Sequence, residues 1–149
     1  MSNIQTIKIE LDGDPLTRGY AGMTDEEVSM DVNTVYRTRK EPISSAELLA
    51  WSASDARLQK IKNASESGAD DTIKSIALAA YLMITRGDTT LDLNLADRMA
   101  LLNALVSYGV LTADDKTALE SLAVVAISRG EELGIGSVRT GDVIQARSL

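Results

Sequence analysis

The sequence predicts a mainly α protein, a single small helical domain with three long antiparallel helices. Three observations predict this fold. Apolar residues recur at helical spacing through the second half of the chain. Ser or Thr stands three residues before Glu or Asp at several expected helix starts. Glycines follow the expected helix ends. With 149 residues, 44% of them hydrophobic, the chain can bury the core of one domain.

Residues 1–43 are expected to form an irregular N-terminal segment with short helices. Residues 3–11 fit two patterns, since Ile4, Ile7 and Leu11 share a helical stripe while residues 7–11 also alternate like a strand. The interpretation as helix or strand stays open here. Thr24 and Glu27 form a capping box, which predicts a helix from there to Asn33.

Residues 44–133 are expected to form the helical core. Ser44 and Glu47 form a second capping box, and residues 52–55 are a candidate break between two short helices. Trp51 is expected to anchor the smaller N-terminal half to this core, because a large aromatic side chain buries much apolar area. Residues 134–149 are expected to be a C-terminal tail.

The three long helices are predicted at about 70–86, 94–108 and 113–133. The first is apolar on most of its faces, so we expect it to lie centrally in the core. Gly87, Gly109 and Gly134 follow the three helix ends. Short connections between them favour antiparallel packing.

Composition excludes several kinds of chemistry. The chain has no Cys and no His, so disulfides, imidazole or thiol metal ligands, and catalytic groups of those types are excluded. We expect no cofactor, no metal and no enzymatic activity. One enzymatic hypothesis stays open, a hydrolase that depends on a pair of carboxylates, but no particular pair in the sequence stands out. Asp25–Glu27, Asp70–Asp71 and Asp114–Asp115 lie at expected helix starts, where acids favour the helix dipole.

The net charge of −7 repels phosphates, so we expect no direct binding to nucleic acid. No run of 18 apolar residues is present, which predicts no membrane span. The first residues also lack the pattern of a signal peptide.

One group of residues suggests a contact surface. Arginine and tyrosine are enriched in the residues that dominate protein interfaces. The interface candidates are Arg18, Tyr20, Tyr36, Arg37 and Arg39. The alternative is a solvated loop in which the tyrosine rings are partly buried.

Three segments, residues 14–23 (DPLTRGYAGM), 33–37 (NTVYR) and 128–147 (SRGEELGIGSVRTGDVIQAR), resemble a family of small tailed-bacteriophage proteins found among late virion and assembly genes. The resemblance covers both ends of the chain, while the middle matches only in helical character. It implies a structural or assembly protein at a head–tail junction or neck, or associated with the tail. Its partners would be other phage structural proteins or copies of itself.

The resemblance implies a location in the virion or the host cytoplasm. The alternative is an acidic intracellular inhibitor of a host protein, which serves anti-defence or host takeover. The net charge motivates this alternative, because an acidic surface can occupy a basic groove.

Overall fold

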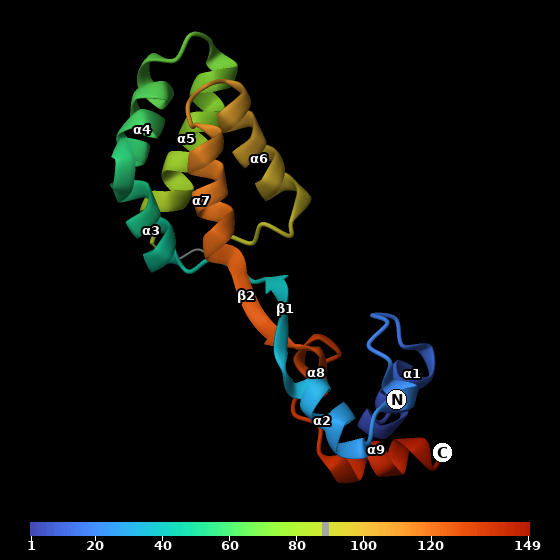
Figure 1. Cartoon of the computed structure of the whole chain (residues 1–149). Helices are drawn as coiled ribbons and strands as arrows, with labels where there is room; N and C mark the ends of the chain where they lie inside the picture. Colours follow the sequence, from blue (N-terminus) through green and yellow to red (C-terminus); the bar gives the residue numbers. More distant parts are fainter. Residues whose placement is uncertain (88–89) are drawn as a thin grey trace. The chain divides into compact units, whose positions relative to one another are not determined.

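The computed structural model describes residues 1–87 and 90–149, and it is mainly helical, which confirms the predicted fold class (Figure 1). The chain forms two compact units, whereas the sequence predicts one domain of three segments. Unit 1 comprises Met1–Arg39 and Ala126–Leu149, and unit 2 comprises Lys40–Val125. The difference arises because apolar residues near both chain ends pack on one another, so the expected tail is part of unit 1.

Unit 1 is built from short helices. They are α1 (Asn3–Gly13), η1 (Tyr20–Gly22), α2 (Asp25–Asn33), α8 (Arg129–Glu132) and α9 (Thr140–Arg147). Residues 3–13 are helical because Ser2 and Gln5 cap the helix reciprocally, which settles the open choice in favour of helix. α9 packs against both α1 and α2. The core contains Ile7, Tyr20, Val28, Val32, Val138, Val143 and Ala146.

Unit 2 contains α3 (Ser45–Ala53), η2 (Ser54–Ala56), α4 (Arg57–Ser67), α5 (Asp71–Thr85), α6 (Ala96–Ser107) and α7 (Ala113–Ala123). α5 packs against α3, α4 and α6, and α7 packs against α3 and α6. The expected break after α3 is present, because Asp55 and Ala56 adopt the left-handed backbone conformation, which does not continue a right-handed helix. Within unit 2, Ile43 and Leu91 form an isolated antiparallel β-bridge.

The prediction of one continuous helix over residues 113–133 is wrong. Helix α7 ends at Ala123, and strand β2 (Val124–Ser128) follows and pairs with β1 (Val35–Lys40). Val124, Val125 and Ile127 are β-branched, and such side chains suit a strand. Residues 70–86 and 94–108 do contain helices, α5 and α6, but the arrangement of three long antiparallel helices is not confirmed.

Two further expectations need correction. α5 is not enclosed by the core, since Leu78 and Leu82 on its outer face are 46% and 48% exposed. Trp51 does not anchor the N-terminal half, because it lies in the core of unit 2 with α5, α6 and α7 side chains around it. Its indole N–H donates to the Asp115 carbonyl oxygen at 3.1 Å, so it joins α3 to α7.

Candidate functional site

All five predicted contact residues belong to unit 1, but the structure does not leave all of them available to a partner. The Tyr20 side chain is fully buried in the unit 1 core and is therefore a core residue. Burial raises the pKa of Tyr20, and the neighbouring Tyr36 adds to this. The hydroxyl groups of Tyr20 and Tyr36 are buried without a hydrogen-bond partner among the described residues.

Arg18 and Tyr36 are brought together on the surface of unit 1. The Arg18 guanidinium stacks over the Tyr36 ring, 4.4 Å from the ring centroid, and forms an ion pair with Asp31 of α2. The hydrogen bond to Asp31 raises the pKa of Arg18 above its ordinary value. Asp14 fixes the backbone that carries Arg18. Its carboxylate accepts hydrogen bonds from the backbone N–H groups of Arg18 and Gly19, both at 2.7 Å.

A shallow groove lies beside this pair. Its lining includes Gly19, Gly22, Met23, Met30 and Asp31. Gly19 has a positive φ, a conformation that glycine adopts at little cost, and this turn shapes one wall. Met30 is one of the lining residues and is 71% exposed. Asp31, which lines the groove with Met30, is the ion-pair partner of Arg18. Methionine, arginine and tyrosine are all enriched at protein interfaces.

Arg37 lies in an ion-pair network. Its Nε and Nη2 donate to Glu132 at 2.8 and 2.9 Å. Arg129 also binds Glu132, at 2.8 Å, and forms two hydrogen bonds with the buried Glu10 at 2.8 and 2.7 Å. The network therefore joins α1, α8 and β1, and Arg37 is engaged by a contact within unit 1. Arg39 is exposed on β1.

The network has a defined response to pH. Hydrogen bonds from Arg37 and Arg129 lower the pKa of Glu132 from its ordinary 4.5 to about 2. Because the pKa of Glu132 is lower in the folded than in the unfolded chain, its ion pairs stabilise the folded state fully above about pH 4.5. This stabilisation is lost as the pH falls through about 2, where Glu132 becomes protonated in the folded state.

The three segments that carry the bacteriophage resemblance meet in unit 1. The Arg147 guanidinium donates to the carbonyl oxygens of Tyr20 and Met23 at 2.7 and 2.9 Å. The Asn33 side chain exchanges two hydrogen bonds with the Val138 backbone, at 2.7 and 2.8 Å. Residues 128–147 are thus bonded directly to both of the other segments.

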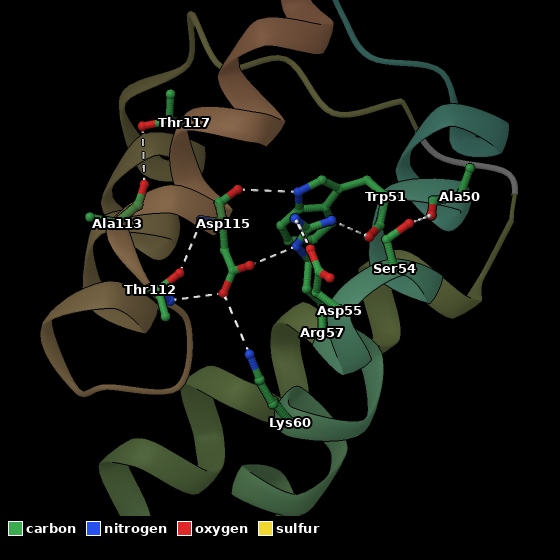
Figure 2. Close-up of polar contacts among 10 residues, drawn as sticks. All are labelled: Ala50, Trp51, Ser54, Asp55, Arg57, Lys60, Thr112, Ala113, Asp115 and Thr117. Carbon is green, nitrogen blue, oxygen red and sulfur yellow. Dashed lines mark hydrogen bonds and ion pairs between the residues drawn. The ribbon is translucent and has the colours of Figure 1, made fainter.

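Sequence reasoning missed a buried polar cluster in unit 2 (Figure 2). The Asp115 carboxylate accepts hydrogen bonds from Arg57 Nε at 2.8 Å and from the Thr112 backbone N–H at 2.9 Å. Arg57 also binds the Trp51 carbonyl oxygen at 2.9 Å and Asp55 at 3.0 Å. Arg57 and Asp115 are 7% and 4% exposed, which marks the cluster as an internal support for α3, α4 and α7.

Asp115 therefore combines two roles. Its place in a capping box confirms the prediction that Asp114–Asp115 opens a helix. Burial favours the protonated acid, but hydrogen bonds from Thr112 and Arg57 outweigh burial and hold the pKa of Asp115 below its ordinary value. The acidic residues at the expected helix start indicated the helix cap. Arg57 lies in a distant part of the sequence, so no local signal indicates its ion pair with Asp115.

Comparison of the chain with protein-family models, with curated proteins and with solved structures finds no match. The helices in the described part of the chain include none that is both long and apolar enough to cross a membrane. Over the same residues, no group of three acidic side chains is arranged to hold a metal ion.

Proposed function

We propose that this chain is a non-enzymatic structural or assembly protein of a tailed bacteriophage, at a head–tail junction, neck or tail, and that it acts by protein–protein contact. The observation that carries the proposal is the unit 1 groove that Met30, 71% exposed, lines together with Asp31, the ion-pair partner of the Arg18 side chain that stacks over Tyr36. Arg18 is held in place by Asp31, so a partner would meet a preorganised side chain at low entropic cost.

The bacteriophage resemblance supports the same unit. Its three segments all fall in unit 1, and hydrogen bonds join them there. A fold built from these segments presents the Arg18–Tyr36 surface as one of its faces. The proposed partner is another structural protein of the particle, which would cover Met30 with apolar side chains and the Arg18–Asp31 pair with polar ones.

The contact surface differs from the one that the sequence predicted. Tyr20 is removed from it because its side chain is fully buried. Arg37 also serves the fold through Glu132, so exchanging Arg37 for Glu would place two acids together and cannot test contact alone. Met30 is the sharper probe, since no core cluster includes it.

The test is Met30→Lys in a bacteriophage whose genome encodes this chain. Lysine near the C-terminus of α2 suits the helix dipole, so the fold is expected to persist. Charging a dominant contact residue costs about 2 kcal/mol or more of binding, roughly a 30-fold loss of affinity. We therefore expect a clear drop in infectious titre, with circular dichroism of the purified variant unchanged.

The matched control is Leu49→Lys, an apolar-to-lysine change at a side chain that is 50% exposed on α3 of unit 2. It should leave the titre normal. A normal titre with Met30→Lys, in a variant that is folded, would contradict the proposed contact surface.

A further inference from the structure

The outer face of α5 in unit 2 is exposed along its whole length. Asp71, Ser75, Leu78, Ala79, Leu82 and Arg86 are all exposed. At about 100° per residue, five of them lie within a sector of about 80°, and Ala79 lies at its margin. The steps from Asp71 to Ser75, Leu78 and Leu82 alternate between four and three residues, which is the pattern of a helix seam that packs against another helix.

This face is apolar in the middle and charged at its ends. Leu78 and Leu82 are 46% and 48% exposed, whereas the other face of the helix is buried through Ala77, Ala80 and Ile84. Asp71 stands in the first turn, and Arg86 is the C-cap residue. Neither the Asp71 nor the Arg86 side chain forms a hydrogen bond or ion pair with the described residues.

We propose that the α5 face binds the α5 face of a second copy of this chain, with the two helices antiparallel. The charges select this occupant and this direction. In an antiparallel pair centred between Leu78 and Ala79, Asp71 of each copy lies opposite Arg86 of the other, so two ion pairs form across a two-fold axis. A parallel pair would instead place Asp71 against Asp71 and Arg86 against Arg86.

The same register matches side-chain sizes. Leu78 of one copy lies opposite Ala79 of the other, and Leu82 lies opposite Ser75. Each large side chain therefore meets a small one, which lets the helices approach closely and interdigitate. The charge pairing and the size pairing are independent features of the sequence, and both give the same centre.

The face is small in comparison with stable interfaces, which use about 20–30 residues a side. We therefore expect a weak dimer of the purified chain, which higher-order assembly could reinforce by raising the local concentration. The surface is separate from the groove in unit 1, so this inference holds or fails independently of the proposed function.

Sedimentation equilibrium of the purified full-length chain over a concentration series tests the pairing. Leu82→Glu buries an uncompensated charge in the seam, so we expect the dissociation constant to rise at least about tenfold. Leu122→Glu, at an exposed leucine of α7, is the matched control and should leave association unchanged. Circular dichroism checks that each variant is folded.

Charge exchange tests the direction. Asp71→Lys and Arg86→Glu should each weaken the dimer, and the double variant should restore it, because the two exchanged charges would again face each other across the axis. A chain that stays monomeric at all concentrations would overturn the inference. A dimer that Leu82→Glu leaves intact, or that the double variant fails to restore, would also overturn it.

Discussion

At the scale of single residues, the buried Arg57–Asp115 pair of unit 2 is the most consequential contact. Both side chains are almost fully removed from solvent, and hydrogen bonds connect them to each other and to the backbone around them (Figure 2). Leaving a buried charge without its partner is far more costly than losing an exposed ion pair. Arg57 binds one carboxylate of each kind, since Asp115 is buried and Asp55 is exposed. The costs of losing a buried and an exposed ion pair can therefore be compared on the same arginine.

We predict that Asp115→Asn lowers the free energy of unfolding by about 3 kcal/mol or more, because the buried Arg57 charge loses its buried counter-ion and keeps only the exposed Asp55. Asp55→Asn makes the same chemical change at a side chain that is 75% exposed, so it should cost less than about 1 kcal/mol. Urea unfolding followed by Trp51 fluorescence measures both. Equal costs for the two variants would contradict a buried-pair role.

At the scale of elements, the turn after α8 depends on the absence of a side chain at Gly130. The Gly130 carbonyl oxygen accepts hydrogen bonds from the backbone N–H groups of Ile135 and Gly136, which folds the chain tightly back on α8. A Cβ atom at Gly130 would lie 2.1 Å from the Gly136 carbonyl oxygen, a backbone atom that cannot simply turn aside. The resembling segment 128–147 thus contains a glycine that the fold requires.

We predict that Gly130→Ala destabilises unit 1 by about 1–3 kcal/mol or more, because the backbone must shift to admit the methyl group. Gly141→Ala is the matched control in the first turn of α9, where an added Cβ meets nothing within 4 Å. It should be neutral or stabilising by up to about 1 kcal/mol, since alanine favours helix. Thermal unfolding by far-UV circular dichroism measures both variants, and equal melting temperatures would contradict the steric account.

The elements show where sequence reasoning succeeds and where it fails. Local signals predicted the starts of α2, α3 and α7 correctly, because a capping box is complete within the first turn of a helix. The predicted helix through residues 124–128 failed because pairing with β1 involves residues from a distant part of the sequence. At the candidate site, residue type indicated Arg18 and Tyr36, but nothing local showed that Tyr20 is buried or that Met30 is exposed.

At the scale of the whole molecule, each of the two units has its own apolar core. Val143 is fully buried in the core of unit 1, and Ile61 is fully buried in the core of unit 2. The single tryptophan, Trp51, belongs to unit 2, so its fluorescence reports on that unit alone. Circular dichroism reports on the helices of both units, and the two probes together separate them.

Val143→Ala removes about 2 kcal/mol of core packing from unit 1. We predict that it lowers the midpoint of an unfolding transition followed by circular dichroism and leaves unchanged the midpoint followed by Trp51 fluorescence. Ile61→Ala should lower the fluorescence midpoint instead. This follows if each core stabilises its own unit. A coincident shift in both probes for both variants would show that the units unfold as one.

The central claim is that this chain is a component of a bacteriophage particle or of its assembly. Quantitative mass spectrometry of purified particles, from a tailed bacteriophage whose genome encodes the chain, tests it most directly. We predict that the chain is present at a reproducible copy number, as a protein placed by specific contacts would be. Absence from particles and from assembly intermediates, with the chain recovered only on a host protein, would contradict the claim and favour the acidic inhibitor.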